Sequence, residues 1–329
     1  MFILSQNILA GVVKFLVEEC EADLGDETED GITALHIAAD NNYLELAAYL
    51  ISLNRMDLDV EDSDQTSAAS FAARNGHCEI LKMLIESGAS VDSHDDEGWT
   101  LLHHAVSSGK LEACVVLMEW GAKISAKNNE GKTPFLLACM VGELEIVKLF
   151  LDNHEQRART TANCAIGEQL IAPQSSLLDI DDNHANCFHE VASRGHSSLL
   201  QFLIDRAKTA PCTIEGQSLI HMLLQQQNDD FNRTPIHLAA IEGHVECVAN
   251  IVAIKDGMVV SPLEHRDLHG RTVLHLATLS TGCYSSLVSR LLDDWGADPE
   301  AMDNMGSTYK TVEYNNDANQ YDEHNESDY

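Results

Sequence analysis

The sequence predicts an interrupted solenoid of stacked helical repeats. The first observation is a Thr-x-Leu-His pattern, with Ile once replacing Leu, that returns along the 329-residue chain. The second is its period, because the aligned threonines Thr33, Thr66, Thr100 and Thr133 lie 33, 34 and 33 residues apart. A unit of this length cannot bury its own apolar face and must stack on copies of itself. Such chains form binding surfaces far more often than catalytic pockets. The copies of the pattern are Thr33–His36, Thr100–His103, Thr234–His237 and Thr272–His275.

Each repeat carries start and stop signals for a short helix. Thr33, Thr100 and Thr133 can cap a helix start, and Pro134 stands where a first-turn proline is tolerated. The following segment, for example 80–85, places apolar residues at i, i+3 and i+4, as an amphipathic helix does. We therefore expect two helices per repeat. Glycine, which adopts the left-handed conformation at little cost, is expected to end the first helix at Gly76, Gly109, Gly142, Gly195 and Gly243.

Several residues per copy resemble the ankyrin repeat. The best copy begins Glu130-Gly131-Lys132-Thr133-Pro134 and continues through Gly142 to the apolar run at 144–151. The resemblance implies an all-α ankyrin-repeat solenoid, in which paired antiparallel helices alternate with β-turn fingers. It also implies that the repeated histidine is structural and bonds to neighbouring backbone. The histidines at this repeat position are His36, His103, His189, His221, His237 and His275.

Breaks in the period divide the chain. Residues 1–152 are expected to form a first stack whose first copy is partial, because 8–17 look like an outer helix without its inner helix. Residues 153–178 lack clear periodicity and are predicted to be an irregular insertion. Residues 179–298 are expected to form a second stack. Residues 299–329 are predicted to be an acidic disordered tail, because they cannot bury enough apolar surface to fold alone.

The second stack contains a half-repeat near 214–228. An inner helix is expected at Ser218-Leu219-Ile220-His221, yet Thr234 follows Ser218 by only 16 residues, so no outer helix fits between them. We expect the apolar face formed by Leu219, Met222 and Leu223 to be poorly covered. Because solenoid cooperativity depends on contacts between neighbouring repeats, the two sides of this defect are predicted to unfold separately.

The charge of the chain is strongly negative, with a formal net charge of −33. Acids gather in the turns, where the candidates for partner contact are Asp62, Asp64, Asp95, Asp96 and Glu97. If the turns project along one edge as the resemblance implies, they form an acidic ridge that repels nucleic acid and anionic lipid and favours a partner with a basic segment. The alternative is that turns simply hold solvated charges.

The position between the repeat glycine and threonine faces outward in the ankyrin family and often contacts partners. Trp99 is predicted to be an exposed interface anchor, and packing of its ring on a neighbouring finger is the alternative. Lys132, Arg233 and Arg271 are further candidates, and the change from acids to arginines indicates two different faces. The full set at this position is Ile32, Gln65, Trp99, Lys132, Gln217, Arg233 and Arg271.

The sequence lacks the common catalytic, phosphate-binding and metal-binding motifs. There is no phosphate-binding glycine loop, nucleophile elbow, His-Glu-x-x-His pair or calcium loop. Nine cysteines occur without a Cys-x-x-Cys pair, and no apolar run reaches 18 residues. We therefore predict a cytoplasmic, non-enzymatic scaffold with no catalytic or metal site, no cofactor and no direct membrane insertion, which binds a protein partner.

A narrower resemblance is to the cytosolic ankyrin arrays of ankyrin-class transient receptor potential channels. It rests on the run Asp267–Ala277, on the lengthened linker 251–266 and on the two close copies at 219–221 and 232–237. It implies an alternative identity, a fragment or splice form of the sensor or assembly array of such a channel, with channel subunits as partners at the cytosolic face of a membrane. No pore helices follow in the sequence given, so we expect no ion conduction.

Overall fold

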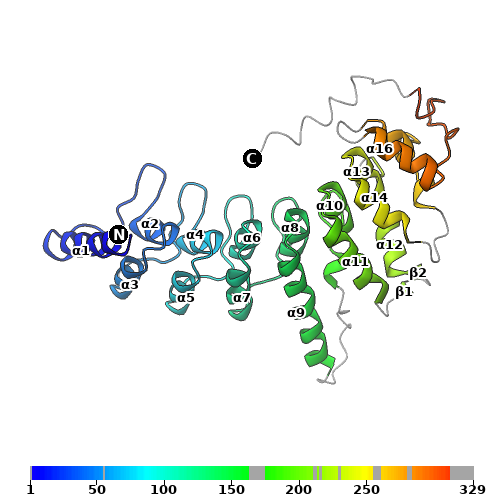
Figure 1. The fold of residues 1–329 in the computed structure, drawn as a ribbon. Coiled ribbons are helices and arrows are strands. Elements are labelled where there is room, and N and C mark those ends of the chain that lie inside the picture. Colours follow the sequence, from blue (N-terminus) through cyan, green and yellow to red (C-terminus); the bar gives the residue numbers. More distant parts are fainter. Residues whose placement is uncertain are drawn as a thin grey trace. The chain divides into compact units, whose positions relative to one another are not determined.

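The chain forms two compact units of paired helices, Met1–Asp182 and Asn183–Tyr329, which are described separately (Figure 1). The structure, a computed structural model, describes residues 2–54, 56–162, 175–209, 213–214, 217–228, 231–254, 261–279 and 284–311.

In unit 1 the helices stand in two rows. Each inner helix packs on the next inner helix and each outer helix on the next outer helix, with α1 packed on α3 at one end. The loops that lead into the inner helices project from one edge (Figure 1). The inner helices are α2 (Ala34–Asp40), α4 (Ala68–Asn75), α6 (Leu101–Ser107) and α8 (Pro134–Val141). The outer row contains α1 (Phe2–Glu19), α3 (Leu44–Ser52), α5 (Cys78–Glu86), α7 (Leu111–Glu119) and α9 (Leu144–Ala162), and the 3-10 helix η1 (Ser175–Leu178) follows.

The predicted helix signals are confirmed with one shift of register. Thr33, Thr100 and Thr133 occupy N-cap positions in extended backbone, and Gly142 ends α8 at φ +87°. In the second repeat the N-cap is Ser67, not Thr66. There, Gln65 takes the positive φ of +58° that glycine takes in the neighbouring turns. Because this turn lacks the glycine, the sequence period points to Thr66, one residue before the true N-cap.

The irregular insertion predicted at 153–178 cannot begin at residue 153, because α9 continues to Ala162. Pro173 is the first proline after Pro134, so no proline interrupts this stretch. Residues 163–174 lie outside the described residues. At the predicted partial first copy the structure has the helix α1, which is longer than the expected 8–17 and packs on α3.

Unit 2 repeats the two-row plan with fewer layers. α13 packs on α10 and α15 on α13, while α14 packs on α11. The inner helices are α10 (Cys187–Ser193), α13 (Pro235–Ile241) and α15 (Val273–Ala277). The outer helices are α11 (Ser197–Thr209), α14 (Val245–Val252) and α16 (Tyr284–Ser289), which leads into a π-helical turn η3 (Arg290–Asp294). A short 3-10 turn η2 (Pro262–Glu264) precedes the last finger pair.

The half-repeat is present, but its apolar face is covered, contrary to our expectation. A small hairpin of β1 (Thr213–Ile214) and β2 (Gln217–Ser218) leads into α12 (Leu219–Gln225), which packs on α11 and α13. Leu219 is 2% exposed and Leu223 is fully buried. Because α10 and α11 contact α13 and α14 directly, α12 is an addition beside the stack and not a gap in it. The predicted separate unfolding of the two sides therefore loses its physical basis.

The expected tail also begins later than predicted. Residues 301–308 form a further finger, in which Asp303 N–H donates to Ser307 O (2.9 Å). His275 Nε2 of α15 bonds to the same Ser307 carbonyl at 3.0 Å, as in the other repeats. Residues 312–329, the rest of the predicted tail, lie outside the described residues. Within the described part of the chain, no helix is long and apolar enough to cross a membrane.

Candidate functional site: the finger edge

Each finger is a tight turn closed by its first residue. In the third repeat Asp95 N–H donates to Trp99 O (3.1 Å), and Asp95 Oδ1 accepts the N–H groups of Glu97 (3.1 Å) and Trp99 (2.7 Å). A side-chain oxygen that accepts two N–H groups replaces a hydrogen-bonded turn partner and fixes the loop. The same arrangement of side chain and backbone occurs at Asp62, Asn128, Asp267 and Asp303.

Neighbouring fingers are joined by single backbone bonds. In unit 1 the second residue of a finger donates its N–H to the backbone carbonyl of the third residue of the preceding finger. These bonds run from Ser63 to Asp30 (2.9 Å), Asp96 to Asp64 (3.2 Å), Asn129 to Glu97 (2.9 Å) and Asp182 to Glu130 (3.1 Å). In unit 2 Leu268 donates to Phe231 (2.8 Å) and Asn304 to His269 (2.9 Å). These bonds hold the tips of successive fingers side by side, so side chains at the same turn position form a row.

The repeated histidine anchors each finger to the inner helix. In the third repeat Thr100 N–H donates to His103 Nδ1 (3.1 Å), and His103 Nε2 bonds to Lys132 O of the next finger (3.0 Å). Because Nδ1 must accept, the ring is neutral with its proton on Nε2. The predicted structural role is confirmed for His36, His103, His189, His237 and His275.

Burial lowers the pKa of three of these histidines. It lowers the pKa of His103 to about 4, against the opposing effect of the bonded Lys132 carbonyl. The pKa values of His189 and His237 are also lowered to about 4, again mainly by burial. The rings of His103, His189 and His237 therefore stay neutral at physiological pH.

The tips of the unit 1 fingers carry a continuous set of acids. Asp30, Asp64, Glu97 and Glu130 occupy the third finger position, and each is exposed. Glu130 is partly neutralised by Lys132 Nζ at 3.1 Å. We call this set the acidic fingertip row: Glu29, Asp30, Asp64, Asp96, Glu97, Glu130 and Asp182, all exposed. Sequence reasoning found Asp64, Asp96 and Glu97 but missed the others, although their place before the repeat glycine or its substitute could have revealed Asp30 and Glu130.

Asp95 does not belong to this row, which corrects its place among the ridge acids. Its side chain is 10% exposed and lies 3.1 Å from His104 Nε2 of α6. Burial raises the pKa of Asp95, but the hydrogen bonds from His104 and Trp99 N–H and the charge of His104 outweigh it, so the pKa is lowered overall. Asp62, which closes the preceding finger, is likewise half-buried. Both carboxylates stabilise turns.

Trp99 is half-buried and thus less exposed than the anchor interpretation expects. Its ring packs on His104 (centroids 5.7 Å apart) and His103 (6.2 Å), both on the helix that follows its own finger. Lys132, at the equivalent position of the next finger, is also half-buried and contacts Met140 Sδ at 3.6 Å.

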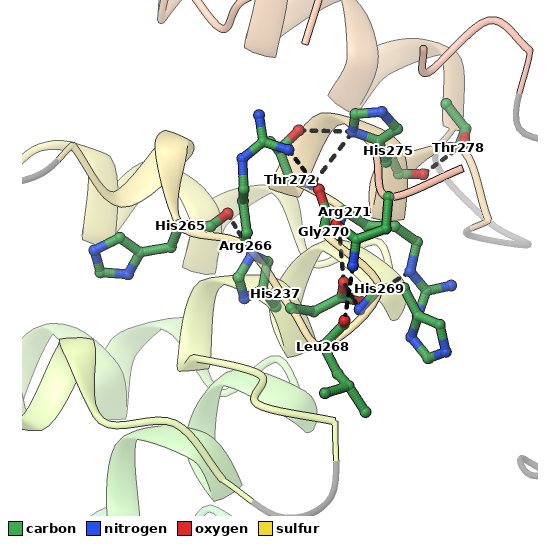
Figure 2. Close-up of polar contacts among 12 residues, drawn as sticks. His237, His265, Arg266, Leu268, His269, Gly270, Arg271, Thr272, His275 and Thr278 are labelled. Atoms are coloured by element: carbon green, nitrogen blue, oxygen red, sulfur yellow. Dashed lines mark hydrogen bonds and ion pairs between the residues drawn. The ribbon is translucent and has the colours of Figure 1, made fainter. Parts of the chain in front are cut away.

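The two arginine candidates lie in unit 2 and are half-buried as well. Arg271 Nε donates to Asp267 Oδ2 at 2.8 Å, and its side chain lies beside His269 (Figure 2). The Arg233 guanidinium stacks 4.6 Å above the Phe231 ring. The outward position of the repeat is thus only partly solvent-facing. Gln65, which the sequence places in this set, is exposed but takes the glycine position of its turn, and Thr66, which stands at the outward position in the structure, is buried. Gln217 is not described at the side-chain level.

The side chains of the finger edge do not form a metal-binding cluster in the described residues. In the part of the chain that the structure describes, no group of three or more His, Cys, Asp or Glu side chains could hold a metal ion. The edge offers charged and apolar side chains on braced turns, an arrangement that binds macromolecules by complementarity.

Comparison with known proteins identifies the class. A family model described as "Ankyrin repeats (3 copies)" matches residues 2–95, 71–164 and 212–303, so the chain belongs to the ankyrin repeat family. The crystal structure of the human ASB11 ankyrin repeat domain is similar, with 20% sequence identity, a TM-score of 0.56, and coverage of 79% of this chain and 98% of that chain. At this identity the similarity shows the fold alone. No curated protein matches the chain. Ankyrin repeats generally mediate protein–protein interaction and are typically non-enzymatic.

Proposed function

We propose that the chain is a protein-binding scaffold that captures a basic segment of its partner along the acidic fingertip row of unit 1. The observation that supports this is the braced row itself. Asp30, Asp64, Glu97 and Glu130 recur at one position of successive fingers, and the carbonyl of each accepts a bond from the next finger. Fixed charges attract an opposite charge without first having to be ordered, which lowers the cost of binding.

The negative charge of the chain favours a partner segment with basic side chains. A net charge of −33 disfavours phosphates and anionic lipid heads. Lysines and arginines spaced along a peptide would face one finger after another. Trp99 lies two residues after Glu97 and contributes apolar surface next to the row, and Lys132 Nζ pairs with Glu130. The nine scattered cysteines, among which the sequence has no Cys-x-x-Cys pair, support a cytoplasmic location.

A charge-matched pair of variants tests this proposal. In the first variant Asp64→Asn, Asp96→Asn and Glu97→Gln remove three charges from the row. In the control Glu79→Gln, Glu86→Gln and Glu119→Gln remove three exposed charges from the outer helices. The probe is a lysine- and arginine-rich peptide, with its association rate measured across ionic strength. We expect the row variant to slow association about ten-fold at low salt and to flatten the salt dependence, with little change in the control. Equal effects in both variants would contradict the proposal.

The channel-array identity remains an alternative proposal that rests on the sequence resemblance. A full-length transcript in which membrane-spanning segments follow the repeats would favour it, and one without them would favour the scaffold.

A further inference from the structure

The first helix of unit 1, α1, exposes a face that the other outer helices of this unit bury. Its run Val-Val-Lys-Phe-Leu-Val-Glu at 12–18 aligns with Ile80–Glu86 of α5 and with Ile146–Asp152 of α9. In this run Val12 is 48% exposed and Leu16 is 43% exposed. The equivalent residues are at most 3% exposed, and they are Leu46 and Leu50 of α3, Ile80 and Leu84 of α5, Ala113 and Leu117 of α7, and Ile146 and Phe150 of α9.

The periodicity of the helix shows where this face points. Lys14 of α1 and its equivalent in α5, Lys82, are both exposed to solvent. Leu16 lies about 200° around the helix from Lys14, since successive residues are about 100° apart. Val13 and Val17 are less exposed and lie between these two directions, on the side that fits the packing of α1 on α3. Val12 and Leu16 therefore point away from solvent in the geometry of a repeat, towards the row of inner helices.

The helix that should cover this face is missing from the repeat of α1. In the repeat of α5 the cover is α4, an inner helix that packs on α5. The chain turns from α4 to α5 at Gly76, in the left-handed conformation. Residue 8 is the equivalent of Gly76, and α1 runs through it as unbroken helix from Phe2 to Glu19. The chain therefore does not fold back at this point to cover its own face, whereas the end of a solenoid normally presents a polar surface.

The inner helices of unit 1 show what kind of helix fits. Each presents an alanine five residues after its N-cap, and these alanines, all fully buried, are Ala38, Ala72, Ala105 and Ala138. A small side chain lets the two helices of a repeat lie close together, so that the larger side chains of the outer helix fill the space between them. Because only a tight turn separates α4 from α5, the two helices are antiparallel.

The charge around the open face is negative at one end. Glu19 ends α1, and Lys14 is the only lysine or arginine among residues 1–30. The dipole of α1 adds partial negative charge at its C-terminal end. A second copy of the chain would bring the same acids, so charge disfavours self-association through this face. The exposed acids of the loop that follows α1 are Glu21, Asp23, Asp26 and Glu27.

We propose that the open face of α1, formed by Val12, Phe15 and Leu16, binds an amphipathic helix of a partner protein that presents alanine and leucine and is preceded by lysines or arginines. This helix takes the place of the missing inner helix and lies antiparallel to α1. Its apolar side chains remove the open face, including the 59% exposed Phe15, from water. Its basic residues meet Glu19 and the acidic loop, and its positive N-terminal end meets the negative end of α1. The open face shares no residue with the acidic fingertip row.

The test uses the full chain and a labelled helical peptide of about 18 residues, long enough to form helix on binding, with binding measured by fluorescence anisotropy. The peptide carries alanine and leucine on one face, glutamine on the other and three lysines before the helix. A second peptide has the lysines after the helix, and a third has the apolar residues scattered around it.

Two pairs of variants report on the apolar face and on the charge. Val12→Gln combined with Leu16→Gln makes the face polar and keeps a good helix former at both positions, which circular dichroism verifies. Its control is Leu178→Gln, which removes a 38% exposed apolar side chain from η1. Glu19→Gln combined with Glu27→Gln removes two acids at the end of α1, and its control is Glu79→Gln combined with Glu86→Gln on α5.

We expect the Val12 and Leu16 variant to weaken binding of the first peptide about ten-fold and Leu178→Gln to leave it unchanged. The Glu19 and Glu27 variant should weaken binding about three-fold and reduce its salt dependence, and its control should do neither. The peptide with lysines after the helix should bind several-fold more weakly than the first, because its charges lie at the wrong end.

The proposal is overturned by an absence of saturable binding up to about 1 mM peptide, by equal binding of the scattered peptide, or by equal loss in Leu178→Gln. It is also overturned if sedimentation shows a dimer of the chain that the Val12 and Leu16 variant dissociates and the peptide does not, because the face would then bind a second copy. The variant of Asp64, Asp96 and Glu97 should leave the first peptide bound, and the Val12 and Leu16 variant should still bind the lysine- and arginine-rich peptide. The two proposals therefore fail separately.

Discussion

Acidification should destabilise the repeats through their buried histidines. A His189 pKa of about 4, set against 6.5 in the unfolded chain, means that the unfolded state binds more protons between these values. Stability is therefore fully present above about pH 6.5 and is lost as the pH falls towards 4. At about pH 5 the loss amounts to about 2 kcal/mol for this one residue. His237 in the same unit adds a similar loss, a large share of a typical stability of about 5–15 kcal/mol.

The assay compares the chain with His189→Gln by urea unfolding, followed by circular dichroism, at about pH 7 and pH 5. Glutamine can donate to the Arg233 carbonyl and accept from Asn186 N–H, but it has no proton to gain in this range. The carboxylates titrate alike in both proteins, so the difference between their pH dependences isolates the histidine. We expect the loss between the two pH values to be smaller by about 2 kcal/mol in the variant. The control His184→Gln changes an exposed ring and should leave the loss unaltered. An unchanged pH dependence in His189→Gln would refute the argument.

Three further substitutions test the finger edge and the extra helix. Asp95→Ala removes the turn closure and the contact with His104, so it should cost about 2–3 kcal/mol of unfolding free energy, while Asp96→Ala should change it by less than about 0.5 kcal/mol. Gly131→Ala places a Cβ against the Asp182 carboxylate in backbone at φ +74°, and should lower the melting temperature by the equivalent of about 1–3 kcal/mol; an unchanged melting temperature would exclude this strain. Leu223→Ala should lower the unfolding free energy by about 2–5 kcal/mol in denaturant unfolding. A change near zero would mean that the half-repeat is uncovered, as the sequence predicted.

The fold was largely predictable because the repeat signals are local. Threonine caps, first-turn prolines and terminal glycines act within one helix, and Thr133, Pro134 and Gly142 stand in the structure where the sequence places them. The errors arose where a signal was replaced. Gln65 takes the conformation of a glycine, and Asp303-Asn304-Met305-Gly306 forms a finger in a segment that the sequence predicts to be disordered.

The candidate site was less predictable because exposure depends on contacts between repeats. Asp95 and Asp96 are adjacent acids, yet one closes a turn beside His104 and the other faces solvent. The burial of Leu219 and Leu223 depends on α11, which no local pattern connects with α12. The places of Phe231 and His269 at the tips of their fingers follow from the backbone bonds between fingers, which the sequence does not show.

The central claim is that partners bind along the finger edge, with basic segments on the unit 1 tips. The most direct measurement is amide chemical-shift mapping of the full chain during titration with the lysine- and arginine-rich peptide. The account predicts that the largest changes fall on Asp64, Asp96 and Glu97 and on the linking amide of Asn129, and that they fade with added salt. Changes confined to the inner helices α4, α6 and α8, with the fingertip amides unmoved, would contradict it.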